Sequence, residues 1–161
     1  MDIFDHAMQL EKEGETYYRE LAGKCGSEGL KSILEWLADE EVRHYGLFEK
    51  MKEGASPELR ESVLLPGAKD IFSKMAGKSE KFDLQVSQLA LYRKAQEIEK
   101  ASEEYYLQKA KEVKLSYQRD MFNKVAEEEK KHYFLIDNII EFLSRPEAWL
   151  ENAEFNHLDE Y

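Results

Sequence analysis

Four long segments of this 161-residue sequence place apolar residues at steps of three and four, the spacing of one face of an α-helix. Each of these faces is interrupted near its middle by one glutamate. The glutamates are Glu11, Glu41, Glu99 and Glu129, and the second and fourth are followed one turn later by His44 and His132. A chain with this pattern can pack its helices together only if it also buries four carboxylates.

The breaks between these segments give the expected helix bounds. We predict helices over about 3–22, 30–53 and 84–113, and a fourth from Ser116 to just before Pro146. Glycine-rich runs end the first two segments. With only 8 Gly and 3 Pro, the composition disfavours a many-stranded sandwich, which needs frequent turns. The sequence therefore predicts an all-α protein.

The connection between the second and third helices is unusually long. It runs from residue 54 to 83 and holds a short apolar segment over 69–75, whereas loops within helix hairpins have ~2–8 residues. A connection of this length can return along a helix of ~36 Å. We therefore expect a bundle of two antiparallel hairpins joined by a long crossover over residues 1–145. Residues 146–161 would add a short helix and a docked tail.

An internal repeat relates the two hairpins at a constant offset of 88 residues. Residues 7–55 align without gaps on residues 95–143 and give 14 identities in 49 positions. The identities include Glu11/Glu99, Tyr18/Tyr106, Glu41/Glu129 and His44/His132. Unrelated amphipathic helices would share Leu, Lys and Glu rather than His and paired Tyr, so we interpret the match as an internal repeat.

The repeat also places the four glutamates at one level of the bundle. The midpoint of Glu11 and Glu41 is residue 26, and that of Glu99 and Glu129 is residue 114, each inside a predicted turn. Both pairs would therefore lie ~22 Å from their turns. A buried ionised carboxylate must be paired, protonated or bound to metal. No Lys or Arg lies near the glutamates on these faces, whereas two divalent cations would compensate their charge.

Four carboxylates and two imidazoles are a suitable ligand set for two first-row metal ions. Imidazole with oxygen ligands suits iron or manganese better than calcium, which takes oxygen ligands. Di-iron and di-manganese bundles use one Glu from each of two helices and Glu-x-x-His from the other two. We predict that the metal ligands are Glu11, Glu41, His44, Glu99, Glu129 and His132. Tyr18 and Tyr106 would hydrogen-bond to ligand carboxylates, and the alternative is a metal-free bundle whose glutamates face water.

The stretches EKEGETYY, EEVRH, EKASEEYY and EEKKH resemble the rubrerythrin-like branch of the ferritin-like superfamily, over about residues 1–145. The resemblance implies a ferritin-like four-helix bundle with a non-haem di-iron centre. It implies that Glu41 and Glu129 bridge the irons, that Glu11 and Glu99 are terminal ligands, and that each histidine completes one iron. It also implies an oxidoreductase that reduces peroxide or oxygen.

The sequence departs from that family in two places. Full rubrerythrins carry a rubredoxin-like domain with paired CxxC motifs, whereas this sequence has one cysteine, Cys25, so we expect a separate, rubredoxin-type electron donor. The family also has an extra glutamate one turn after the third-helix ligand, which switches with the redox state of the iron. Here that position is Ser102, and its repeat partner is Gly14. Glu103 could substitute, but we favour its ion pair with Lys100.

Composition narrows the function classes. A net charge of −11 argues against nucleic-acid binding, and no apolar run approaches the ~20 residues of a membrane span. The N-terminus lacks a signal-peptide pattern and one cysteine cannot form an internal disulfide, so a cytoplasmic protein is expected.

Three functions remain open at this point. The first is an oxidoreductase with two iron ions, or manganese, that acts on peroxide or oxygen. The second is a non-redox iron binding or storage protein of ferritin-like type, and the third is a metal-free interaction module. A homodimer is expected, and the long crossover would permit domain swapping between protomers.

Overall fold

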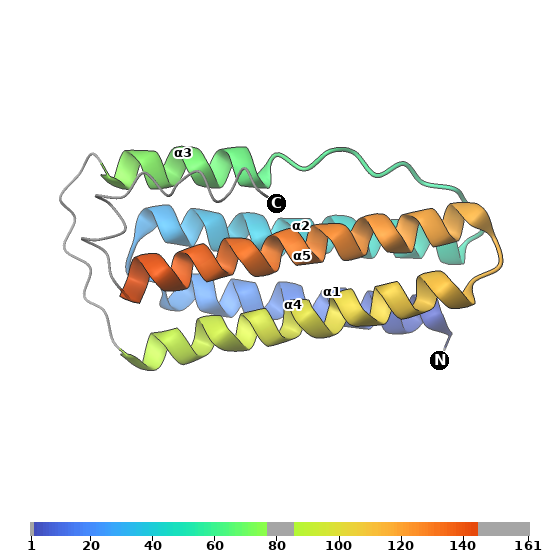
Figure 1. The fold of residues 1–161 in the computed structure, drawn as a ribbon, viewed down its shortest axis with the longest axis horizontal. Helices are drawn as coiled ribbons and strands as arrows, with labels where there is room; N and C mark the ends of the chain where they lie inside the picture. Colours follow the sequence, from blue (N-terminus) through green and yellow to red (C-terminus); the bar gives the residue numbers. More distant parts are fainter. Residues whose placement is uncertain (1, 77–85, 145–161) are drawn as a thin grey trace.

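The structure, a computed structural model, describes residues 2–76 and 86–144, which contain five α-helices. They are α1 (Ile3–Lys24), α2 (Glu28–Lys52), α3 (Leu64–Ala76), α4 (Val86–Glu112) and α5 (Ser116–Ser144). The helices α1 and α2 form one antiparallel hairpin and α4 and α5 form the other, as Figure 1 shows. The hairpins meet through α1 with α4 and α2 with α5, which confirms the predicted ferritin-like bundle. The predicted tail over 146–161 lies outside the described residues.

Local capping sets where the first hairpin turns. The helix α1 continues through Gly23 to Lys24, two residues beyond the predicted end. The helix α2 begins two residues earlier than predicted, because the Ser27 side chain accepts a hydrogen bond from the Leu30 N–H at 3.4 Å. The turns therefore span 25–27 and 113–115, still centred on residues 26 and 114. The predicted level of the four glutamates depends on these two centres.

The crossover contains a helix where the sequence suggested only a short apolar segment. From the end of α2 the chain returns along the bundle, and α3 then lies beside α2 (Figure 1) and reaches α5 through the rings of Phe72 and Phe142. Pro66 is tolerated because it sits in the first turn of α3, where a backbone N–H has no helical partner. A Cβ on Gly67 would lie 2.9 Å from the Trp36 ring, so glycine permits this close approach to α2. None of the helices in the described ranges is long and apolar enough to cross a membrane.

Two clusters of buried apolar side chains fill the bundle, one toward each end. The cluster toward the 25–27 turn includes Leu34 and Ile136, and α3 adds Phe72 to it. The cluster toward the other end is centred on Phe48, Tyr106 and Phe122, with ring centroids 5.0–6.0 Å apart. The buried polar layer described next lies between these clusters.

Candidate metal centre

The structure brings all six predicted ligand side chains together in the layer between the two apolar clusters. Each is at most 2% exposed. They are Glu11 on α1, Glu41 and His44 on α2, Glu99 on α4, and Glu129 and His132 on α5. Because all four glutamates lie at the same distance from their hairpin turns, the four helices place their carboxylates at one level of the bundle.

The six side chains form two overlapping groups that could each hold a metal ion. One group contains Glu11 and His44, the other contains Glu99 and His132, and both contain Glu41 and Glu129. Within each group the candidate ligand atoms all lie within 4.8 Å of one another. The two shared glutamates therefore belong to both groups, and each Glu–His pair belongs to one.

The atoms of these side chains that make no hydrogen bond fit cations. Seven buried side-chain nitrogen or oxygen atoms make no hydrogen bond in the described residues, and six of them belong to this layer. They are Glu11 Oε2, Glu41 Oε1, His44 Nδ1, Glu99 Oε2, Glu129 Oε1 and His132 Nδ1, one from each predicted ligand. Unsatisfied buried polar atoms are rare in proteins, so such a cluster needs an explanation. Two divalent ions would supply +4 against the −4 of four carboxylates.

Both imidazoles present the same nitrogen to the carboxylates. His44 Nδ1 lies 3.0 Å from Glu129 Oε1 and 3.5 Å from Glu11 Oε2. His132 Nδ1 lies 3.4 Å from both Glu41 Oε1 and Glu99 Oε1. The two rings are nearly parallel, with centroids 5.9 Å apart. Each ring can therefore offer Nδ1 to a metal and keep Nε2 for a second partner.

The two glutamates that belong to only one group, Glu11 and Glu99, each accept a hydrogen bond from a tyrosine of the other hairpin. The Tyr106 hydroxyl donates to Glu11 Oε1 at 2.6 Å, and the Tyr18 hydroxyl donates to Glu99 Oε1. Burial, followed by the charge of the neighbouring glutamate, raises the pKa of both tyrosines well above its usual value. Both hydroxyls therefore stay protonated and leave the second oxygen of each glutamate turned to the centre of the layer.

Without cations, the layer is under electrostatic stress. Burial and the charge of Glu11 raise the pKa of both Glu41 and Glu129 well above its ordinary value. Burial opposes a charge on His44, but the carboxylates of Glu11, Glu128 and Glu129 together outweigh burial and raise the pKa of that imidazole well above its usual value. In the metal-free protein, bound protons therefore neutralise part of the negative charge that cations would otherwise balance.

Small residues leave room beside the carboxylates. A Cβ on Gly14 would lie 2.7 Å from Glu41 Oε2, so glycine is what allows the Glu41 carboxylate to occupy this place. Its repeat partner Ser102 is 3% exposed. Glu103 pairs with Lys100 at 3.7 Å, as the sequence predicted, and is not among the groups that could hold a metal.

We expect Gly14→Ala to weaken metal binding about tenfold, the lower end of the effects seen for residues around metal ligands. The new methyl group would displace the Glu41 carboxylate. The metal-free fold should survive, because alanine is the better helix former by up to about 1 kcal/mol. Gly46→Ala is the control, since Gly46 lies within α2 with open space around its Cβ position. Equal metal affinities of the two variants in a chelator competition would contradict this reading.

A carboxylate that the sequence did not predict lies behind one of the histidines. Glu128 Oε1 lies at hydrogen-bond distance, 2.7 Å, from His44 Nε2. The same oxygen accepts a hydrogen bond from the Arg43 guanidinium at 2.5 Å. Glu128 stands next to a predicted ligand in a run of three glutamates, which made it look like part of a solvent face. The repeat held a signal, because Glu128 is identical to Glu40 at the 88-residue offset.

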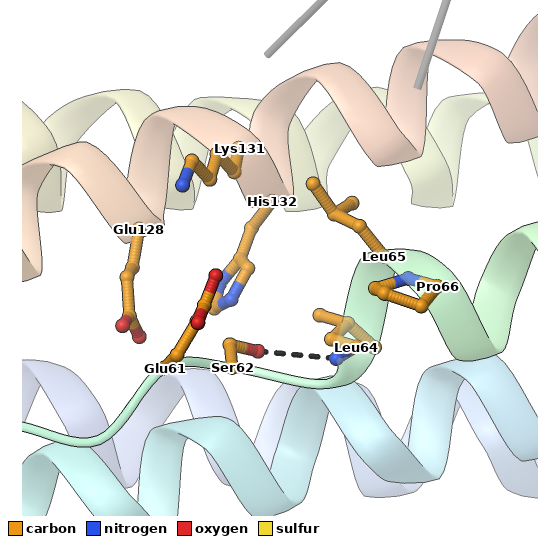
Figure 2. Close-up of a pocket in the computed structure, with 8 residues that line it drawn as sticks. All are labelled: Glu61, Ser62, Leu64, Leu65, Pro66, Glu128, Lys131 and His132. Carbon is orange, nitrogen blue, oxygen red and sulfur yellow. Dashed lines mark hydrogen bonds between the residues drawn. The ribbon is translucent and has the colours of Figure 1, made fainter. Parts of the chain in front are cut away.

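A cavity of about 200 Å³ lies against the centre. Figure 2 shows it between α5 and the residues that lead into α3, with Glu61, Glu128 and His132 among its lining side chains. Its other wall is apolar, formed by Leu64 and the residues after it. Since His132 Nδ1 faces the carboxylates, the remaining edge of this ring is the one that borders the cavity.

Comparisons with known proteins agree with this arrangement. A family model described as Rubrerythrin matches residues 2–140. A solved structure, a hypothetical protein from Pyrococcus furiosus, is similar with a TM-score of 0.68 and 22% sequence identity over 89% of each chain, which supports the fold alone. No curated protein sequence matches the chain.

Proposed function

The chain belongs to the rubrerythrin family, and from that membership we propose that it is a non-haem di-iron oxidoreductase that reduces hydrogen peroxide, or oxygen, with electrons from a separate donor. The observation that carries this proposal is the cluster of six buried atoms, one from each of four carboxylates and two imidazoles, that face one another without hydrogen bonds. Their division into two overlapping groups supports a site for two ions.

In this proposal Glu41 and Glu129 would be shared between the two ions. Glu11 and His44 would complete one coordination sphere, and Glu99 and His132 would complete the other. Two bound iron ions would supply the two electrons that convert hydrogen peroxide and two protons into two molecules of water.

The protein residues would orient and protect this chemistry. The hydroxyls of Tyr18 and Tyr106 donate hydrogen bonds to one oxygen of Glu99 and of Glu11, so the second oxygen of each carboxylate stays turned toward the centre of the layer. The apolar clusters on both sides exclude bulk water from the layer. The cavity at His132 supports an approach for a small reactant from the side of the crossover.

The electrons would come from an iron site outside this helical bundle. Rubredoxin-type electron transfer uses an iron held by four thiolates. This sequence contains one cysteine, Cys25, which is half-buried at the hairpin turn far along α1 from the metal layer. We therefore propose a rubredoxin-type partner as donor.

Non-redox iron binding or storage is the second candidate. It is favoured by Ser102, which stands where the family carries a further glutamate that moves with the redox state of the iron. A storage protein needs to bind and release iron but does not need repeated two-electron turnover. The same experiment separates the two candidates.

The test is metal quantitation with an optical spectrum before and after peroxide. We expect about two metal ions per chain in protein made in iron-replete cells. Addition of peroxide to the anaerobically reduced protein should produce ferric absorption, and a reduced donor should reverse it through many cycles. Accumulation of many irons per chain without donor-dependent turnover would favour storage.

Two variants on α4 sharpen this test. Glu99→Gln removes a proposed ligand and should lower the metal content. Glu103→Gln is the control, because Glu103 lies one turn after Glu99 and pairs with Lys100. Full metal content in Glu99→Gln would contradict the proposed ligand set. Absence of metal from the parent protein would support a metal-free helical module instead.

A further inference from the structure

The two histidines of the metal layer have different surroundings on the edge that faces away from the carboxylates. His44 Nε2 lies 2.7 Å from Glu128 Oε1, and the Glu128 side chain is only 12% exposed. His132 instead borders the cavity at the crossover. No hydrogen bond or ion pair joins His132 to Glu40, the repeat partner of Glu128, in the described part of the chain.

Arg43 accounts for this difference between the two halves of the repeat. Its guanidinium pairs with both Glu40 and Glu128, and it also donates to the Arg60 carbonyl oxygen at 3.1 Å. The repeat partner of Arg43 is Lys131, which lines the cavity. A planar guanidinium can hold two carboxylates and a carbonyl together, whereas a lysine ammonium lacks that fork. One side of the layer is therefore clamped to the crossover.

We propose that Glu128 is the positioning residue of the metal centre: its carboxylate accepts the Nε2–H of His44, fixes the ring with Nδ1 toward Glu11 and Glu129, and makes the metal position at His44 tighter than the one at His132. This inference rests on the proposed two-metal site. A carboxylate behind a ligand imidazole fixes its tautomer and increases its basicity as a ligand. Among the described residues no carboxylate is hydrogen-bonded to the outer edge of the His132 ring, which borders the cavity that Glu61 also lines (Figure 2).

The same residues do not form a third metal position. Glu40, His44 and Glu128 are close enough together to hold an ion. However, Arg43 already places its positive charge between the two carboxylates. A metal ion there would have to displace the guanidinium and share the imidazole with the main site. Arg43 instead completes the chain of contacts from the crossover to His44.

Cobalt(II) titration of the full-length protein tests the proposal, because cobalt is a spectroscopic probe that does not need peroxide or a donor. We expect the parent to bind two equivalents in two distinguishable steps. Glu128→Gln keeps the shape but removes the charge of the acceptor, and should weaken one step by about 10–100-fold. Glu40→Gln is the matched control, since Glu40 shares the repeat position and the Arg43 contact but makes no hydrogen bond to a histidine in the described residues. It should change both steps by less than about threefold.

Proton NMR of the cobalt-loaded parent gives a second readout that does not depend on how the variant folds. Two exchangeable, metal-shifted imidazole N–H signals are expected, one from each ligand histidine. The signal of His44 should exchange slowly with water because Glu128 covers it, and the signal of His132 should exchange fast. In Glu128→Gln the slow signal should shift or broaden.

Several outcomes would decide against the inference. Two unchanged binding steps in Glu128→Gln, equal effects of Glu128→Gln and Glu40→Gln, or two equally fast N–H signals in the parent would each overturn it while leaving a two-metal site in place. Failure of the parent to bind two cobalt ions would overturn the proposed site, and this inference with it.

Discussion

Replacing Glu41 with leucine is expected to stabilise the metal-free protein at pH 7 by about 1–4 kcal/mol, the range seen when well-packed apolar residues replace buried charges. The same change should abolish binding of at least one metal ion. Glu41 is 2% exposed and faces three other carboxylates in the layer. Leucine has a similar volume and removes both the cost of desolvation and the repulsion. Glu129→Leu should behave alike, since Glu129 occupies the equivalent position in the repeat.

The pH dependence of this gain follows from the direction of the pKa shift. Burial and the charge of Glu11 raise the pKa of Glu41 in the folded protein. Below the unfolded value of about 4.3, the carboxyl is protonated in both states and adds no penalty. As the pH rises above that value, the unfolded chain loses its proton while the folded protein keeps it. Stability of the parent therefore falls with pH until the folded pKa is passed. The advantage of Glu41→Leu should be smallest near pH 4 and largest near neutrality.

Thermal unfolding of metal-free protein between pH 4 and 8 measures this difference. Glu49→Leu is the control, since Glu49 is exposed on the same helix, and it should change stability by no more than about 0.5 kcal/mol. If the parent and Glu41→Leu melt at the same temperature at pH 7, these glutamates are solvated and the layer is not the strained site described above.

The repeat and the apolar faces were sufficient to predict the bundle and the buried layer of glutamates and histidines. Helical spacing identified which face of each helix is buried, and the two turn centres at residues 26 and 114 placed four glutamates at one level. These features depend on short-range rules, namely helix geometry and the length of hairpin turns. They are therefore readable from the sequence without knowing how the hairpins meet.

Features that depend on contacts between distant segments could not be predicted in the same way. The helix α3 begins at Leu64, because Pro66 can occupy a first turn and Gly67 fits against Trp36 of α2. In the sequence, that proline and glycine look like helix breakers. Glu128 likewise became visible only when α2 and α5 were brought together, because its partners Arg43 and His44 lie about 85 residues away.

Installing the missing family glutamate, in Ser102→Glu, is expected to speed the oxidation of the reduced protein by hydrogen peroxide by about tenfold, or about 1.4 kcal/mol of activation free energy. Ser102 is buried one turn after Glu99. By the repeat, it matches Gly14, whose Cβ position lies 2.7 Å from a Glu41 oxygen. A carboxylate at residue 102 should therefore reach the centre. Two ferrous ions would carry a charge of +4, which four carboxylates balance. The negative charge of a fifth carboxylate would therefore favour the oxidised ions, which carry more positive charge.

Stopped-flow mixing of the anaerobically reduced, iron-loaded protein with peroxide or with oxygen measures this effect. The parent should react faster with peroxide than with oxygen, and Ser102→Glu should widen the difference. Ser102→Gln separates charge from size, because it adds the same bulk without the carboxylate, and it should not accelerate the reaction. The fifth buried carboxylate should also destabilise the metal-free protein, which is the opposite of the effect expected for Glu41→Leu. A faster reaction with oxygen than with peroxide in both the parent and Ser102→Glu would count against peroxide as the substrate and would favour oxygen reduction or iron storage, since the installed carboxylate would then have no peroxide chemistry to assist.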